Sequence, residues 1–480
     1  MAGAKEWKHE RWRPMLPMPG APSSSWRLTR ARMTAAVGGM DLRVTCAFWL
    51  FGTSSTARRL HTRTCSTLTR RPGLINNIFY VIILSAALDL VGPSIPKATV
   101  LLSSIIPGLA TKLIVPYIIH HVPYSARVIL LATLSTCGML TVALSPSRGA
   151  GGIAAKVAGI VLANVSSGAG EVHFLAVTHF YGTRSLAAWG SGTGGAGLVG
   201  AGAYALATTT LGFGVRGTLL ASAVLPLGMI ISFFAVLPLD PLKTAKGKEL
   251  DYESIPAGEI DDPPVDDRAG LLDPEPQLVS SAYRSRPTST ATGLFADLRL
   301  KLLHARTLVL PYMLPLFLVY VAEYTINQGV SPTLLFPLDQ TPFQHYRAFY
   351  PTYGAIYQLG VFISRSSLPF LRIRNLYVPS ILQVCNLGIV IAQAMVFWIP
   401  SVWFVFGIVF WEGLLGGLVY VSTYAAVREE VKEEEREFSL GAVTVSDSGG
   451  IFVAGLIGAV LEGRLCEWQV RHGRDWCRRL

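Results

Sequence analysis

The sequence predicts an all-α polytopic membrane protein with about eleven transmembrane helices in two bundles. Of its 480 residues, 51% are hydrophobic and only 15% are charged, and the mean hydropathy is +0.44. This composition favours contact with lipid over folding in water. Apolar runs of about 20 residues, the length of helix that crosses the hydrocarbon core, follow one another after residue 74. One long polar segment divides these runs into six and five, which indicates two bundles.

The apolar runs set the expected elements. The first six form an N-terminal bundle over residues 44–52 and 74–238, with spans at 74–92, 98–120, 126–145, 152–180, 185–211 and 217–238. The last five form a C-terminal bundle over residues 307–465, with spans at 307–330, 346–364, 376–399, 401–427 and 438–462. Residues 239–306 are polar and acidic and include the stretch EIDDPPVDD. They predict a disordered cytosolic loop.

The two ends of the chain are basic. Residues 1–73 hold 13 Lys and Arg against three acids, and residues 1–43 are expected to be a cytosolic arm drawn to anionic lipid rather than to nucleic acid. A mitochondrial transit peptide is the alternative interpretation of this arm. The positive-inside rule then places the N-terminus in the cytosol. An odd number of spans puts the basic tail, residues 466–480, on the other side, although its arginines favour the cytosol, so the side of the tail stays open.

Residues 53–73, TSSTARRLHTRTCSTLTRRPG, form an anomalous insertion with five arginines and no apolar period. They separate CAFWLFG, which ends at Gly52, from the apolar run that starts at Leu74. Joining these two segments would give one continuous membrane span. Two interpretations stay open, a cytosolic loop and a gene-model error such as a retained intron.

Ionisable groups at membrane depth cost about 2.5 to 3.5 kcal/mol each, so they are expected to face a cavity or a partner. The candidates are Asp89, Lys112, Glu171, Glu323, Glu412 and Asp447. Lys112 is expected to pair with an acid on a neighbouring helix.

Glu323 is followed one turn later by Asn327, with Gln328 beside it, which predicts a carboxylate with amide partners. This group is either a site for proton coupling or solute, or an interhelical hydrogen bond. Glu171 and Asp447 are further candidates for transport and proton coupling. Arg365, in SRSS at the end of its helix, is assigned preferentially to the membrane edge, with a role in holding an anionic solute as the alternative.

The glycine-rich stretch WGSGTGGAGLVGAGAY contains G-x-G-x-x-G at Gly192, Gly194 and Gly197. It lies in an apolar run and not after a strand, and the first acid that follows is Asp240, so a dinucleotide site is excluded. Gly190, Gly194 and Gly197 are instead expected to let their helix approach a neighbour closely. Glu412, Gly413 and Gly417 are assigned to helix packing for the same reason.

The remaining motifs indicate few further functions. The six cysteines show neither C-x-x-C spacing nor metal spacing with histidine, so no disulfide framework, no metal site and no cofactor are expected. No catalytic arrangement of residues is apparent, which makes an integral membrane enzyme the weakest of the hypotheses. Asp267, Leu271 and Leu272 in the acidic loop match the dileucine pattern that clathrin adaptors bind.

Several long segments resemble the battenin family, the family of the juvenile neuronal ceroid lipofuscinosis protein, and its fungal vacuolar members in particular. The resembling segments are VPYSARV (122–128), SSGAGEVHFLAVTHFY (166–181), WGSGTGGAGLVGA (189–201), YVAEYTINQG (320–329), GVFISRSSL (360–368), WEGLLGGLVYV (411–421) and EREFSLGAVTVSDSGG (435–450). The basic arm, the insertion and the centre of the acidic loop are expected to lie outside this resemblance.

The resemblance implies a fold like that of major facilitator and equilibrative nucleoside transporters, in a lysosomal or vacuolar membrane. It also implies a part in vacuolar pH homeostasis and in the transport of glycerophosphodiesters or basic amino acids. The expected function is therefore an alternating-access transporter of a small polar solute, with protons as a candidate second substrate. The alternative is a scaffold that does not transport and regulates vacuolar pH and trafficking through the loop.

Overall fold

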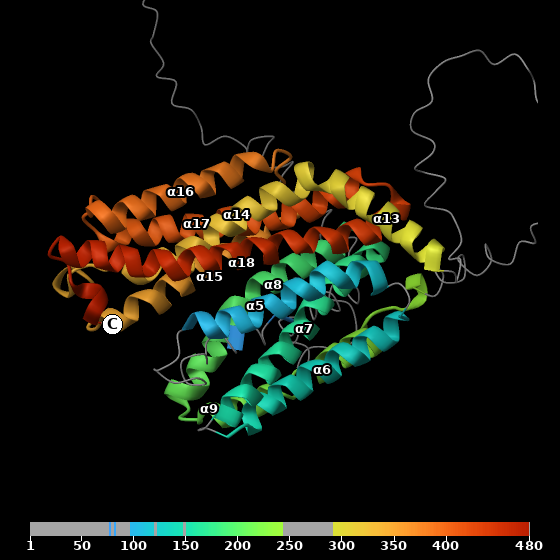
Figure 1. Ribbon diagram of the computed structural model, residues 1–480, viewed down its shortest axis with the longest axis horizontal. Helices are drawn as coiled ribbons and strands as arrows, with labels where there is room; N and C mark the ends of the chain where they lie inside the picture. The colour runs from blue at the N-terminus through green and yellow to red at the C-terminus, as the bar shows by residue number, and fades with distance from the viewer. Residues whose placement is uncertain are drawn as a thin grey trace, which may run out of the picture. The chain divides into compact units, whose positions relative to one another are not determined.

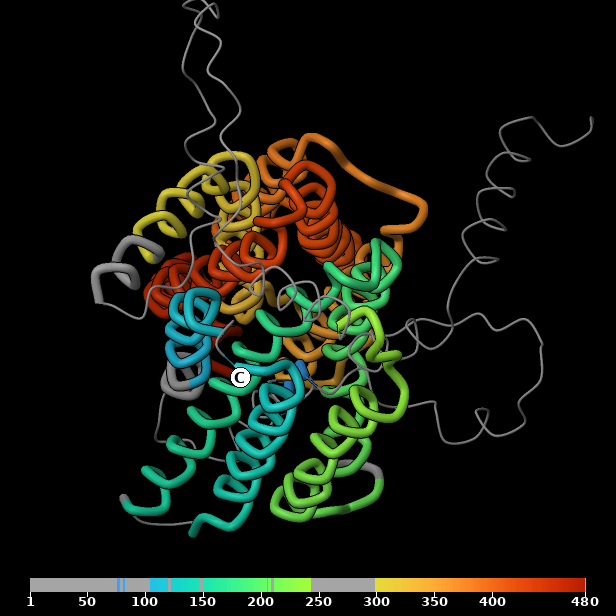
Figure 2. The backbone as a smooth tube through the Cα atoms, turned by 90° about the vertical axis from the view of Figure 1, so that its right-hand side faces the viewer, coloured from blue at the N-terminus to red at the C-terminus, as the bar shows by residue number. Residues whose placement is uncertain are grey.

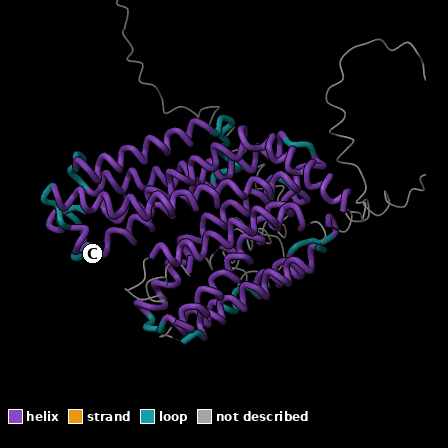
Figure 3. Tube along the Cα trace, in the orientation of Figure 1, coloured by secondary structure: helices purple, strands orange, loops and turns teal. Residues whose placement is uncertain are grey.

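The computed structural model describes residues 76–77, 81–82, 97–119, 122–146, 150–242 and 291–479. Within these ranges the chain is helical apart from turns and short loops (Figure 3). The basic arm, the insertion and most of the first expected span lie outside the described residues, as does the acidic loop with Asp267, Leu271 and Leu272. Asp89 lies outside them too.

The first group of helices, α5 to α10, follows the expected spans closely. It consists of α5 (Lys97–Ile118), α6 (Tyr124–Leu144), α7 (Ala150–Tyr181), α8 (Thr183–Ala205) with the π-helical turn Leu206–Thr210, α9 (Val215–Ser222), and α10 (Leu227–Ile231) with the π-helical turn Ser232–Val236. The sixth span, expected as one helix, is broken by a turn over residues 223–226. Pro226 explains the break, because it has no N–H and its ring clashes with the carbonyl four residues earlier.

The second group, α13 to α18, begins earlier than expected. It consists of α13 (Ala291–Leu308), the π-helical turn Val309–Met313, α14 (Leu314–Thr325), the π-helical turn Ile326–Val330, α15 (Phe349–Ser366), α16 (Tyr377–Val396), α17 (Val402–Glu430) and α18 (Glu433–Arg471). The expectation of a loop up to residue 306 is therefore wrong for residues 291–306. Their sequence, ATGLFADLRLKLLHAR, contains no proline and mixes leucines with charged residues, so it forms a helix although its average hydropathy is too low to indicate a membrane span.

Seven helices among the described residues are long and apolar enough to cross a membrane. They are Tyr124–Leu144, Gly151–Tyr181, Val215–Val236, Leu298–Thr333, Tyr377–Val396, Val402–Glu430 and Glu433–Arg471, and Ser104–Ile118 is a shorter apolar helix. Of the other expected spans, the first lies mostly outside the described residues. Helices α8 and α15 are not apolar enough to be counted as membrane spans. These two helices pack against each other, so their glycine and polar residues need not face lipid.

The two groups of helices lie side by side, as Figures 1 and 2 both show. They meet where α8 packs on α15 and α17, and where α5 and α7 pack on α18. We call the end with Gly182 and Val431 the turn end, because the chain turns there from α7 into α8 and from α17 into α18. We call the end with Phe397 and Gly473 the tail end. Large buried side chains, including Phe174, Trp189 and Tyr420, fill the contact between the groups.

The tail end carries a disulfide between Cys466 and Cys477, so the expectation of no disulfide is wrong for this pair. After α18 ends, Gly473 adopts a left-handed conformation with φ of 79° and reverses the chain. The reversal brings the short helix Trp476–Arg479 back to the last turns of α18. Gln469 fastens the same region, because its Nε2 donates to the carbonyls of Thr333 and Ala394, each at 2.9 Å.

Because disulfides persist in oxidising compartments, we expect the tail end to face the side of the membrane away from the cytosol. In a variant whose other four cysteines are replaced by alanine, maleimide-polyethylene glycol should label Cys466 and Cys477 only after both permeabilisation and reduction. Quantitative labelling in sealed, unreduced vesicles would contradict this orientation. Double substitution of the two cysteines by serine controls for background labelling.

Candidate functional site

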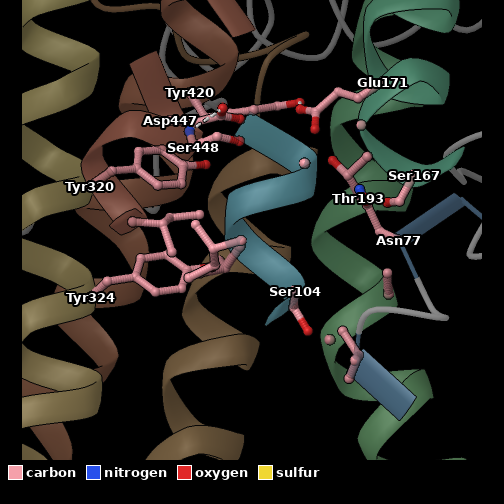
Figure 4. A pocket seen from close by; sticks show the side chains of 18 of the residues that line it. Asn77, Ser104, Ser167, Glu171, Thr193, Tyr320, Tyr324, Tyr420, Asp447 and Ser448 are labelled. Carbon is pink, nitrogen blue, oxygen red and sulfur yellow. Dashed lines mark hydrogen bonds between the residues drawn. The ribbon is translucent and has the colours of Figure 1, made fainter. Parts of the chain in front are cut away.

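A cavity of about 150 Å³ lies between the two groups of helices. Helices α5, α7 and α8 form one wall, and α14, α15, α17 and α18 form the other (Figure 4). The charged lining residues are Lys112, Glu171, Arg365 and Asp447. The lining also carries the hydroxyl groups of Ser104, Thr193, Tyr320, Tyr324, Tyr357, Tyr420 and Ser448. The structure thus brings together three of the predicted site residues, Glu171, Arg365 and Asp447, from three helices.

Lys112 joins two carboxylates from different groups of helices. Its Nζ lies 2.7 Å from Glu171 Oε2 on α7 and 2.9 Å from Asp447 Oδ1 on α18. The three side chains are between 5% and 11% exposed. Asp447 Oδ1 also accepts a hydrogen bond from the backbone N–H of Ser448 at 2.5 Å. This cluster agrees with the expected acidic partner for Lys112, and it holds one carboxylate more than it holds cations.

Tyr420 connects this cluster to Arg365. Its hydroxyl donates to Glu171 Oε1 at 2.8 Å and accepts from Trp189 Nε1 at 3.2 Å. The guanidinium of Arg365 lies over the Tyr420 ring, with Cζ 4.0 Å from the ring centroid. Such cation–π contacts stabilise a buried cation without neutralising its charge.

Arg365 lies in the cavity, so the preferred assignment to the membrane edge is wrong. Its NH1 donates to Thr193 Oγ1 and its NH2 donates to the Tyr320 hydroxyl, each at 2.9 Å. Its Nε has no hydrogen-bond partner in the described part of the chain. Among the described residues no carboxylate forms an ion pair with Arg365. Its positive charge is therefore held by neutral groups.

Two glycines make room for the Arg365 side chain. A methyl group on Gly194 of α8 would lie 3.2 Å from both Cβ and Cδ of Arg365. A methyl group on Gly417 of α17 would lie 3.2 Å from Arg365 Cγ and would overlap Ser364 Oγ. The aliphatic stem therefore passes between two helices that approach each other closely, and the charged group emerges in the cavity.

The other glycines of the α8 stripe also face the second group. A methyl group on Gly190 would lie 2.6 Å from Val421 Cγ1, and one on Gly197 would overlap the amide of Gln358. On α17, a methyl group on Gly413 would overlap the backbone carbonyl of Tyr357. Gly190 thus faces α17, and Gly197 and Gly413 face α15. Together with Gly194 and Gly417, they are the five glycines that the sequence assigned to helix packing.

Glu323 lies behind the cavity wall, and its partners differ from those expected. The Tyr357 hydroxyl donates to its Oε1. The amide of Asn327 instead donates to Glu412 Oε1 at 2.9 Å and to the Glu323 backbone carbonyl at 3.1 Å. Gln328 lies toward Gly458 of α18. Of the two expected amide partners, Asn327 therefore donates to a different carboxylate, that of Glu412 on α17. Asn327 lies in the π-helical turn that follows α14, where the winding differs from that of the α-helix assumed from the spacing.

Polar contacts at the turn end also join the two groups. Arg428 NH1 of α17 donates to the Thr178 carbonyl of α7 at 2.6 Å. The Tyr124 hydroxyl of α6 donates to Glu437 Oε1 of α18 at 2.9 Å. Close to the same level, the hydroxyl groups of Ser191 and Ser366 lie 2.8 Å apart. These contacts hold the groups together on the turn-end side of the cavity.

Sequence reasoning missed the tyrosines of the site. Tyr320 holds Arg365, Tyr357 holds Glu323, and Tyr420 holds both Glu171 and the Arg365 guanidinium. Their signal is weak, because tyrosine is also common in apolar segments that reach the membrane surface. A tyrosine near the middle of a span, with its hydroxyl far from water, is the feature that could have indicated a polar partner.

Comparisons with known proteins agree with this architecture. A family model described as CLN3 protein matches residues 46–468. The chain is 55% identical to Protein btn1 of Aspergillus fumigatus over 476 residues, which covers 98% of each chain. It is 52% identical to Protein BTN1 of Chaetomium globosum over 481 residues, with 97% of each covered. The family model begins at residue 46, beyond the basic arm, whereas the alignments with the two fungal relatives extend over nearly the whole chain.

Solved structures show the same fold. The structure of the human organic anion transporter MFSD10 (TETRAN) superimposes with a TM-score of 0.50 and 14% sequence identity. The match covers 90% of this chain and 95% of that one. At this identity the likeness concerns the fold alone, which is of the major facilitator type and agrees with the expected fold class.

Proposed function

The chain belongs to the battenin (CLN3) family, and we propose that it is an alternating-access transporter of a small polar solute in the vacuolar or lysosomal membrane. The observation that carries this proposal is the charged cavity between two groups of helices, with side chains contributed by both. In transporters of this kind the two halves rock about a central site, which is exposed to one side of the membrane at a time. The contacts of Arg428 and Tyr124 at the turn end would have to break when that end opens.

The charges of the cavity favour a solute with an anionic group. Arg365 is held by neutral hydroxyl groups and an aromatic ring, so a phosphate or carboxylate would supply the missing negative charge. The Lys112 cluster has one carboxylate in excess and suits a cationic group on the same solute. A glycerophosphodiester with an amino headgroup and a basic amino acid both carry this pair of charges.

The same cluster offers a route to proton coupling. The ion pair between Lys112 of α5 and Asp447 of α18 joins the two groups of helices, and Glu171 of α7 shares the same lysine. A proton on Asp447 would remove this ion pair and so weaken the link between the halves. Opening would then depend on protonation, which is how a pH gradient could drive the solute.

Arg365→Gln is expected to lower solute uptake about 10- to 100-fold, the loss that follows from removing a charge-assisted hydrogen bond worth roughly 1.5–3 kcal/mol. Purified protein in liposomes is tested with radiolabelled glycerophosphoethanolamine and arginine, under pH gradients of both directions. Arg347→Gln is the matched control, because Arg347 is exposed just before α15 begins.

Two results would overturn the proposal. One is a wild-type protein that moves neither solute under either gradient, which would favour the scaffold that does not transport. The other is equal uptake by the Arg365→Gln and Arg347→Gln variants, which would remove Arg365 from the solute site.

A further inference from the structure

We propose that Glu323 and Glu412 form a proton-binding pair inside the second group of helices, linked to the cavity by the hydroxyl of Tyr357. The inference rests on the proposed transport function for its biological meaning, but proton binding by the pair is measurable without transport. Glu323 is 1% exposed and Glu412 is fully buried. Neither residue lines the cavity.

One neutral amide contacts both residues, at the carboxylate of Glu412 and at the main chain of Glu323. Asn327 Nδ2 donates to Glu412 Oε1 at 2.9 Å and to the Glu323 backbone carbonyl at 3.1 Å. The remaining oxygen of each carboxylate, Oε2, has no hydrogen-bond partner among the described residues. In the protonated state of each carboxyl group, this oxygen can carry the proton. In the ionised state, the group keeps a buried negative charge that no neighbouring group compensates.

The helices around the pair supply little positive charge. Helix α15 contributes Tyr357 and, about two turns further on, Arg365, which is already held by Thr193 and Tyr320. Helix α18 contributes Asp447, which is paired with Lys112. Within the described residues no ion pair involves Glu323 or Glu412. Two adjacent carboxylates without a cation disfavour the doubly ionised state, so the pair retains a proton.

Helix α16 packs on α14 and α17 and carries buried uncharged side chains. Ser380 Oγ donates to the Pro315 carbonyl at 2.8 Å, which fixes how α16 runs along α14. One or two turns beyond Ser380 stand Gln383 and Asn386, both buried, and their side-chain amides contain atoms without a hydrogen-bond partner in the described part of the chain. Such amides can stabilise either protonation state of a carboxylate, because they donate and accept.

Tyr357 connects the pair to the cavity. It lines the cavity, and its hydroxyl donates to Glu323 Oε1. On the opposite side a methyl group at Gly416 would overlap the Glu323 carboxyl group, so glycine there is what lets the carboxylate lie against α17. The inferred transfer breaks the Tyr357 O–H bond and forms an O–H bond on Glu323. At the same time the Tyr357 oxygen takes a proton from a hydronium ion or a protonated solute in the cavity, so the tyrosine ends neutral.

The test separates coupling from transport. Glu323→Gln and Glu412→Gln are each expected to keep solute exchange between equal concentrations within about twofold of wild type, while uptake driven by a pH gradient falls at least tenfold. Tyr357→Phe should slow the driven uptake. Glu467→Gln, at an exposed position on α18 that forms an ion pair with Arg471, is the control and should change neither.

A second measurement does not depend on transport, and it does not require that a variant at Glu323 folds. Infrared difference spectra of the wild-type protein after a pH jump should show the C=O band of a buried protonated carboxyl group, and this band should be missing or shifted in Glu412→Gln. Unchanged driven uptake in both glutamine variants would overturn the proposal, as would an infrared spectrum identical in wild type and Glu412→Gln. If wild-type protein transports nothing, the proposed function fails, and the infrared spectrum alone decides whether the pair binds a proton.

Discussion

Lys112→Met is expected to lower the free energy of unfolding by about 3–5 kcal/mol, the usual cost of removing one partner from a buried ion pair. The substitution leaves Glu171 and Asp447 facing one another without their shared cation. Methionine fills a similar volume, so the loss reports charge rather than packing. The measurement is thermal or denaturant unfolding of purified protein in detergent, monitored by the loss of the monodisperse peak in size-exclusion chromatography.

The triple variant Lys112→Met, Glu171→Gln, Asp447→Asn should recover most of that stability. Replacing all members of a buried ionic cluster by neutral groups is often neutral or stabilising. The triple variant should nevertheless transport no solute, because the charged lining of the cavity is then reduced to Arg365. A triple variant no more stable than the single one would contradict the ionic role of the cluster.

An exposed ion pair provides the comparison. Arg372 pairs with Glu429 at the turn end, and the two side chains are 38% and 53% exposed. Arg372→Gln should therefore cost no more than about 1 kcal/mol. A similar loss of stability in Arg372→Gln and Lys112→Met would mean that burial of the Lys112 cluster has no special energetic role.

The sequence is sufficient to predict most helices and to indicate that acids within the apolar runs are buried among polar partners. Apolar runs predict α6, α7, α16 and α17 to within a few residues at most ends, because the membrane requires a continuous apolar helix of fixed minimum length. The cost of burying charge explains why Lys112, Glu171 and Glu412 each have a polar partner. Lys112 shows this directly, since an acidic partner could be expected for it before the partner was known.

Partner identity could not be predicted, because it depends on how the helices are rotated and crossed. Spacing places Asn327 on the face of Glu323, but Asn327 lies in the π-helical turn after α14 and its amide donates to Glu412 on α17. Arg365 stands at the end of its helix, yet its stem passes between Gly194 and Gly417 into the cavity. Both outcomes follow from contacts between segments far apart in the chain.

The disulfide was missed for a local reason. The spacing of Cys466 and Cys477 has no recognised pattern, and pairing requires both that α18 ends at Arg471 and that the chain reverses after it. Gly473 provides the reversal. A glycine between two cysteines just beyond a predicted helix is a weak signal, but it was present in the sequence.

Gly413→Leu is expected to destabilise the protein by about 3 kcal/mol or more, the upper part of the range for overpacking a tight contact. Helices α15 and α17 cross with their backbones in contact at this point. A methyl group at Gly413 would overlap the Tyr357 carbonyl and lie 3.0 Å from the Val361 nitrogen, and one at Gly360 would lie 2.5 Å from the Phe410 carbonyl. Because these neighbours are backbone atoms, the helices must separate to admit leucine.

That separation also has a functional consequence. Tyr357 would move with α15, so its hydroxyl would leave Glu323, and pH-driven uptake should fail in whatever fraction of the variant still folds. Gly407→Leu on the same helix is the matched control, because Gly407 is exposed and a methyl group there meets no atom within 4 Å. Leucine at 407 should leave both stability and uptake unchanged. Equal unfolding curves for the two leucine variants would show that α15 and α17 do not depend on this close crossing.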